Sequence, residues 1–167
     1  MARRLILLFL FVPLLSFNQE FFYLGDKSYE SSYECSMKSN SPRDRDDVKI
    51  RFVKDENNNK FIVVSKKYFI ESYITDKLNI YLKNGNVITI NDAYKYDYFD
   101  STMVSIYKLN DDDISKMLNA YINSIRFNHS NKSRGFIGAT ETASTTEDLK
   151  YNPISIQAAL MKIMGLI

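Results

Sequence analysis

The sequence has few of the residues that build disulfide scaffolds, metal centres and flexible linkers. Cys35 is the only cysteine and His129 the only histidine among 167 residues. A single thiol excludes an intrachain disulfide, and one thiol with one imidazole supplies too few ligands for a zinc centre. Five glycines and three prolines are too few for a collagen-like or linker-dominated chain. We therefore expect a fold stabilised by packing, with no bound metal and no cofactor.

The N-terminal segment has the pattern of an export signal. Arg3 and Arg4 precede an apolar run over residues 5–15, and small or polar residues follow from Ser16. This pattern is typical of a secretory signal peptide, and the run is shorter than the about 20 residues that span a bilayer. We expect a signal peptide over residues 1–18 that contacts the membrane only before cleavage, with an uncleaved anchor as the alternative. The mature protein would then lie in the periplasm, on the outer surface or outside the cell.

The expected mature chain has no excess of either charge. Two of the 22 basic residues lie in the signal segment, and all 20 acidic residues lie beyond it, so the net charge is near zero. Binding to nucleic-acid phosphates needs a concentrated excess of lysine and arginine. We expect no nucleic-acid partner.

Alternating and β-branched segments predict a sheet. Asn84-Gly85 joins two such runs and predicts a hairpin with a type I′ turn, in which Leu82 lies opposite Val87. Alternation over residues 29–38 puts Tyr29 and Cys35 on one inward face, so we expect Cys35 to be a core residue rather than a reactive thiol. Further strands are expected over residues 48–52, 61–64, 103–109 and 123–127.

Two helices are predicted. Asn110 can cap a helix over residues 111–120, whose Ile114 and Met117 belong to one apolar stripe. Pro153 opens an amphipathic helix within residues 151–167, which needs either its own sheet or another molecule as a partner. Together with the strands, this predicts an α+β domain over residues 19–128. Its mainly antiparallel sheet of about six or seven strands carries one packed helix, and a polar linker over residues 129–150 leads to the C-terminal helix.

Two stretches resemble known secreted proteins. The segment over residues 5–19 resembles export signals of Bacteroidetes-type bacteria. The segment over residues 80–127 is similar to uncharacterised small secreted proteins of that group, with a hairpin, an acidic helix cap and the run Ile122 to Phe127. The resemblance implies export and an α+β fold. It assigns no activity and no functional residue.

Other patterns for chemistry are incomplete. Asp55, Asn57 and Asn59 match the start of an EF-hand loop, but Lys60 stands at its glycine position and Lys66 at its bidentate glutamate. We expect a polar hairpin loop there and no metal. Catalysis by a Cys35–His129 pair is not expected, because the cysteine lies on an apolar strand face and the histidine in the polar linker, where we expect it to be solvated.

One aromatic cluster remains as a candidate binding surface. Four rings alternate with charged residues in a short segment: Tyr94, Tyr96, Tyr98 and Phe99. Such rings can stack on sugars or anchor a protein partner, although they can also fold back onto their own sheet. We therefore expect a non-enzymatic binding module of the cell envelope, whose partner is another envelope protein or a glycan. An immunity or inhibitor protein fits the same pattern, and the alternative is a small secreted hydrolase with a carboxylate pair of raised pKa in a cleft.

Overall fold

Eleven antiparallel strands and two α-helices build the part of the protein that the structure describes. The computed structural model describes residues 20–41, 46–68, 71–131 and 136–167, so the expected signal peptide lies outside the described residues. The strands are β1 (Glu20–Leu24), β2 (Lys27–Ser31), β3 (Cys35–Ser39), β4 (Val48–Lys54), β5 (Lys60–Lys67), β6 (Tyr73–Leu82), β7 (Val87–Ile90), β8 (Lys95–Phe99), β9 (Thr102–Leu109), β10 (Ile122–Asn131) and β11 (Phe136–Ser144). The helices are α1 (Asp111–Asn119), the short 3₁₀ helix η2 (Leu149–Tyr151) and α2 (Pro153–Met164).

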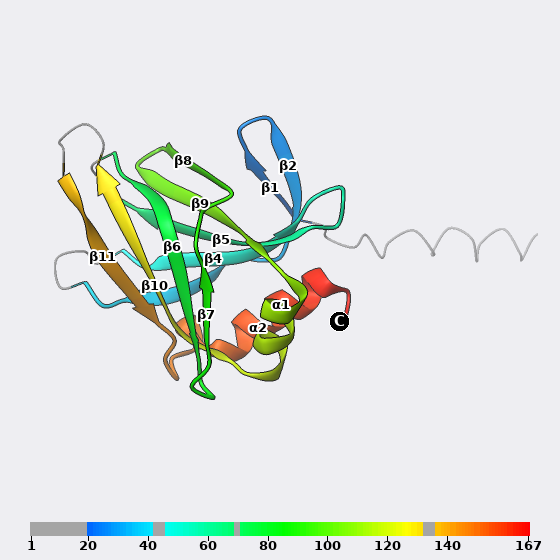
Figure 1. Ribbon diagram of the computed structural model, residues 1–167. Coiled ribbons are helices and arrows are strands. Elements are labelled where there is room, and N and C mark those ends of the chain that lie inside the picture. Colours follow the sequence, from blue (N-terminus) through cyan, green and yellow to red (C-terminus); the bar gives the residue numbers. More distant parts are fainter. Residues whose placement is uncertain (1–19, 42–45, 69–70, 132–135) are drawn as a thin grey trace, which may run out of the picture.

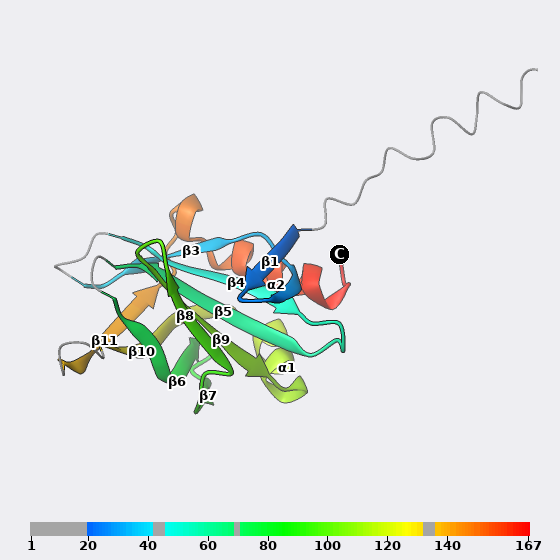
Figure 2. The ribbon, with the colours of Figure 1, turned by 90° about the horizontal axis from the view of Figure 1, so that it is seen from above.

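The strands form one sheet that curls into a half-barrel. Its order is β7-β6-β10-β11-β3-β4-β5-β9-β8, and the β1–β2 hairpin joins it through pairing of β2 with β4 (Figure 1). Seen from above, β6 returns close to β9 (Figure 2). Side chains connect these two strands: the Tyr107 hydroxyl donates to the Asp76 carbonyl at 2.9 Å, and the Ser105 hydroxyl donates to the Ile74 carbonyl. These hydrogen bonds link β6 and β9 across the inner face of the curl.

The main core lies between the inner face of the curl and the two helices. Helix α2 packs on β3, β4 and β10 and lies beside α1 at one end of the sheet (Figure 1). The Gln157 side-chain amide joins the helices by donating to the Leu118 carbonyl at 2.8 Å. The buried stripe of α2 consists of Ile156, Ala159, Leu160 and Ile163. Within the described residues, no helix has the length and apolar character needed to cross a bilayer.

Both predicted helices are confirmed in place. Asn110 caps α1, accepting from the Asp113 backbone N–H at 2.8 Å while the Asp113 carboxylate accepts from the Asn110 backbone. Pro153 begins α2 after an Asn152 cap, and the helix ends at Gly165, whose φ is +69°. The sequence left open whether α2 packs on its own sheet or on another molecule. The structure shows that the apolar stripe of α2 packs on the chain's own sheet.

A second, smaller core lies on the opposite side of the sheet. The β1–β2 hairpin covers the outer face of β4, β5 and β9 and encloses a separate apolar cluster. Its members are Leu24, Tyr29, Val53, Phe61, Val63 and Ile106. Tyr29 and Cys35 therefore belong to different cores, and the expected continuous strand over residues 29–38 is two strands, β2 and β3.

The expected sheet of six or seven strands is wrong. The described residues contain eleven strands, and the range 129–150, expected as a polar linker, contains the end of β10, all of β11 and η2. Strand β11 was missed because Thr140, Thr142 and Ser144 alternate with the small or polar inward residues Glu141 and Ala143, which leaves almost no apolar signal. The structure is a mostly antiparallel curled sheet rather than an α+β domain with a tail.

The Asn-Gly hairpin is present with a different turn and register. Tyr81 pairs with Val87, rather than Leu82 with Val87 as the type I′ turn required. Gly85 has a φ of +89°, and its N–H donates to the Leu82 carbonyl at 3.0 Å, while Asn84 is not among the residues of positive φ. This is a three-residue loop in which only the glycine is left-handed. The one-residue change puts Ile88 rather than Val87 on the buried face, opposite Ile80, and leaves Val87 48% exposed opposite Tyr81.

Candidate functional site

The four aromatic residues of the predicted binding surface do not form one patch. Tyr96 and Tyr98 lie opposite Ser105 and Met103 of β9, and both rings pack edge-on against Tyr73, at centroid distances of 5.5 and 6.3 Å. The Tyr98 hydroxyl is also engaged, because it donates to the carbonyl of Tyr68 at 2.8 Å. These two rings thus pack against Tyr73 of the same chain, and Tyr96 remains 41% exposed.

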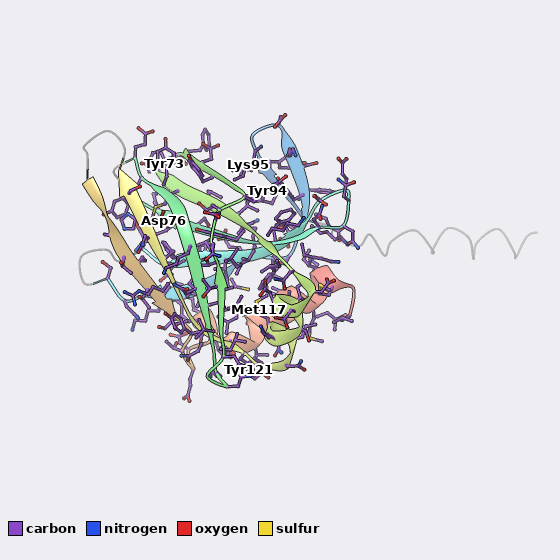
Figure 3. All side chains as sticks on the ribbon, in the orientation of Figure 1. Tyr73, Asp76, Tyr94, Lys95, Met117 and Tyr121 are labelled. Atoms are coloured by element: carbon purple, nitrogen blue, oxygen red, sulfur yellow. The ribbon has the colours of Figure 1, made fainter. Side chains whose placement is uncertain are left out.

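The other two aromatic residues are solvent-exposed but lie apart. Phe99 is 78% exposed at the β8–β9 turn, where Asp100 and Ser101 both have positive φ. Tyr94 precedes β8 and packs on Phe61 of the outer face, at a centroid distance of 5.1 Å. Figure 3 shows Tyr94 and Lys95 on the side of the sheet that carries the β1–β2 hairpin, and Tyr121 near α1 at the opposite end (Figure 3). Of the four rings, that of Tyr94 lines a described hollow in the surface.

That hollow, which we call the Tyr94 groove, has a volume of about 350 Å³. The β1–β2 turn, the β4–β5 loop and Tyr94 form its walls. Its lining residues are Asp26, Lys27, Ser28, Tyr29, Asp55, Glu56, Asn57, Asn59 and Tyr94. All but the two tyrosines are polar aliphatic residues, so the groove is a polar surface with one exposed aromatic ring.

The β4–β5 loop is held in shape by Asp55. One Asp55 carboxylate oxygen accepts from the backbone N–H groups of Asn57 and Asn59, at 2.9 and 2.8 Å, and the other accepts from the Asn59 amide at 2.8 Å. Burial disfavours the charged form of this carboxylate and by itself would raise the pKa of Asp55. The hydrogen bonds outweigh this effect and hold the pKa of Asp55 below its ordinary value. The loop is the polar hairpin loop expected from the sequence, and Asp55 is a structural residue that cannot act as a general acid near neutral pH.

The hydroxyl of Tyr29 is the unusual group of the groove. Tyr29 is 2% exposed, and its hydroxyl oxygen is buried without a hydrogen-bond partner among the described residues. Burial raises the pKa of Tyr29, and the charged or polar groups that modify it further are Lys27, Tyr94, Asp55 and Asp26. All four line the groove, as Tyr29 itself does. A buried hydroxyl without a partner is costly and needs a physical reason.

Tyr94 is positioned by a chain of aromatic contacts. Its ring contacts Phe61, which makes an edge contact with Tyr29 at 5.8 Å, and Tyr29 in turn contacts Phe22 at 6.3 Å. The Tyr94 backbone N–H donates to the Ile106 carbonyl at 2.8 Å. The ring remains 50% exposed. It therefore presents an exposed aromatic surface that packs on Phe61.

The turn between β1 and β2 forms another wall of the Tyr94 groove. Lys95 of β8 lies 3.7 Å from the Asp26 carboxylate and links the turn to the sheet. Gly25 adopts a φ of +61° in this turn, a conformation that glycine accepts without strain. Next to it, Lys27 and Ser28 supply donors to the groove, while Asp26 and Glu56 supply acceptors.

The residues first considered for nucleophilic chemistry lie elsewhere. Cys35 is buried on β3, as expected, and burial raises the pKa of its thiol to about 11. The expectation of a solvated His129 is wrong, because the histidine lies in β10, is 4% exposed and makes an edge contact with Tyr68 at 4.9 Å. Among the described residues, no cluster of three or more His, Cys, Asp and Glu side chains could hold a metal ion.

A second polar cluster lies inside the curl and is internally satisfied. Lys66 and Glu141 form an ion pair of 2.9 Å, and Ser39 donates a hydrogen bond to the same carboxylate oxygen. The Lys66 ammonium also donates to the Ser39 hydroxyl at 3.3 Å. Because these groups neutralise one another, the cluster has the character of a structural support rather than a binding site.

Comparisons with known proteins leave the chain without a relative. No family model, no curated protein and no solved structure matches it. The candidate site therefore depends on the geometry of the Tyr94 groove alone. Sequence analysis found Tyr94 and the polar loop at Asp55 separately, but missed Tyr29 and the β1–β2 turn. No local sequence pattern could predict that these residues lie close together, because they are brought together by the pairing of β2 with β4 and of β8 with β9.

Proposed function

We propose that this protein is an exported, non-enzymatic binding module that takes a glycan in the Tyr94 groove. The observation that carries the proposal is the pairing of a half-exposed tyrosine ring with a buried tyrosine hydroxyl that has no partner. A sugar ring presents an apolar face that can stack on an aromatic side chain, and hydroxyl groups that can satisfy such a phenol.

The remaining groove residues support this choice of ligand. Binding sites for small molecules combine an apolar surface with a few positioned polar groups, and here Tyr94 is surrounded by the Ser28 hydroxyl, the Asn57 amide and the Glu56 carboxylate. These groups offer both donors and acceptors, as a polyhydroxylated ligand requires. Three carboxylates against the single Lys27 disfavour an acidic ligand, so a neutral or amino-bearing glycan fits best.

The export part of the proposal rests on the N-terminal sequence, with its two arginines and its apolar run over residues 5–15. A glycan of the envelope or of the surroundings would be available to a protein in that location. The hydrolase alternative has less support in the groove, because the pKa of Asp55 is lowered where a general acid needs a raised one.

Binding to a printed array of neutral and amino-bearing glycans, followed by titration calorimetry with any glycan that binds, tests the proposal. Tyr94→Ala should weaken binding at least about tenfold, while Tyr94→Phe, which keeps the ring, should bind nearly as the wild type does. The matched control is Tyr121→Ala, because Tyr121 is 40% exposed and lies far from the groove. The absence of any bound glycan, or equal binding by Tyr94→Ala and the wild type, would overturn the proposal.

A further inference from the structure

The outer face of β6, β10 and β11 is a polar surface that carries the cations Lys77 and Arg126. Strand pairing sets Asn79, Arg126 and Thr142 in one row across the three strands, and Tyr81, Ser124 and Ser144 in the next. Lys77 joins this face in a groove of about 480 Å³, whose described lining includes Asn79, Tyr81, Arg126, Asn128 and Thr140. Asp76, the exposed neighbour of Lys77 in sequence, does not line this groove. We call it the Arg126 groove.

The two cations of the Arg126 groove have no counter-ion among the described residues. Lys77 and Arg126 form neither an ion pair nor a hydrogen bond within the part of the chain that the structure describes. Elsewhere on the sheet, the partly exposed Arg51 pairs with Glu34 at 2.5 Å and Lys54 pairs with Glu30 at 2.9 Å. A pair of cations without local neutralisation attracts an anionic ligand.

The amide groups beside these cations also present donors. The Thr89 hydroxyl donates to the Asn79 amide oxygen at 2.9 Å, and the Thr140 hydroxyl donates to the Asn128 amide oxygen at 2.9 Å. Each oxygen accepts one hydrogen bond from a threonine, and the two NH₂ groups are the donors of these side chains. With Lys77 and Arg126 added, the groove is rich in donors and matches a ligand rich in acceptors.

The small number of cations in the groove distinguishes between classes of anionic ligand. A nucleic acid or an anionic membrane would need a concentrated basic surface, whereas this groove has two cations among many uncharged polar residues. A carboxylated oligosaccharide has the matching composition, with few charges, many hydroxyl groups and sugar faces that can stack on Tyr81. We propose that the Arg126 groove is a second binding site that takes a uronate-bearing oligosaccharide.

This proposal is independent of the Tyr94 groove, which has the opposite charge and no lining residue in common with the Arg126 groove. The probe is a hexamer of galacturonate, titrated into the full protein by calorimetry and compared with the methyl-esterified hexamer of the same length. We expect the carboxylated hexamer to bind at least tenfold more tightly than the ester and to lose affinity as salt is added.

Substitutions of the two cations test whether the carboxylated hexamer binds in the Arg126 groove. Arg126→Gln should weaken binding of the carboxylated hexamer at least fivefold, and adding Lys77→Gln should weaken it further. Lys83→Gln removes one exposed lysine from the β6–β7 loop and is the matched control, expected to change affinity less than twofold. Tyr94→Ala should leave this affinity unchanged, which separates this test from that of the proposed function.

Four results would overturn the inference. They are no binding of the carboxylated hexamer at millimolar concentration, equal binding of the ester, equal loss in Arg126→Gln and Lys83→Gln, and tighter binding of a thymidine hexanucleotide or of phosphatidylglycerol vesicles than of the carboxylated hexamer. A urea midpoint for Arg126→Gln within error of the wild type shows that a loss of binding is not a loss of fold.

Discussion

Lys66 and Glu141 meet inside the curled sheet, with the ammonium nitrogen 2.9 Å from a carboxylate oxygen and both side chains shielded from solvent. Their strands, β5 and β11, are not neighbours, since β3 and β4 separate them in the sheet. The pair therefore spans the curl and fixes how far it opens. Both charges are removed from water, so each of them is tolerated in the interior only while the ion pair is intact.

Removing one partner of this pair should destabilise the protein strongly. Glu141→Gln leaves the Lys66 charge buried without the carboxylate that it contacts, and we expect a loss of about 3 to 5 kcal/mol in the free energy of unfolding. Urea unfolding measures it. The control is Glu30→Gln, whose pair with Lys54 is partly exposed and is worth about 1 kcal/mol or less. Equal losses in the two variants would show that the buried pair does not support the fold.

Cys35 should make stability depend on alkaline pH. Burial is the main reason that the pKa of its thiol rises from 9.0 to about 11. The folded protein keeps the thiol neutral where the unfolded chain ionises it, so this contribution is complete below pH 9 and is lost between pH 9 and pH 11. Between pH 8 and pH 10 the wild type should lose about 1.3 kcal/mol more than Cys35→Ala. Parallel pH profiles of the two proteins would contradict this.

The packing of α2 on the sheet predicts a sharp contrast between two of its apolar residues. Leu160 is buried in the main core, whereas Ile154 on the same helix is 59% exposed. Leu160→Ala should lower the free energy of unfolding by about 2 to 5 kcal/mol, and Ile154→Ala by less than about 1 kcal/mol. If chemical denaturation gave similar losses for both, α2 would not be docked through its buried stripe.

The elements that local chemistry specifies were predictable. Asn110 and the three aspartates after it define the start of α1, and Asn152-Pro153 defines the start of α2, because capping involves neighbouring residues only. The position of the Asn84-Gly85 hairpin was also predictable. Its register was not, since Asn84 can enter either of two turn types and the choice changes the pairing by one residue.

What depended on contacts distant in sequence was not predictable. Strand β11 carries little apolar signal, because Glu141 faces inward and its charge is balanced by Lys66, 75 positions earlier in the chain. His129 has polar neighbours in sequence but an aromatic neighbour, Tyr68, in space. The Tyr94 groove is of the same kind, since it brings together the β1–β2 turn, the β4–β5 loop and Tyr94, and only one of these had been considered as a binding element.

The most direct test of the central claim is to map a bound glycan on the protein by nuclear magnetic resonance. The claim is that a sugar stacks on Tyr94 and reaches the Tyr29 hydroxyl. Titration with a neutral or amino-bearing glycan that binds should shift the backbone amide signals of residues 26–29, 55–59 and 94, and leave those of β6, β10 and α1 in place. Shifts confined to the exposed turn at Phe99, or spread over the sheet without the groove, would contradict the account.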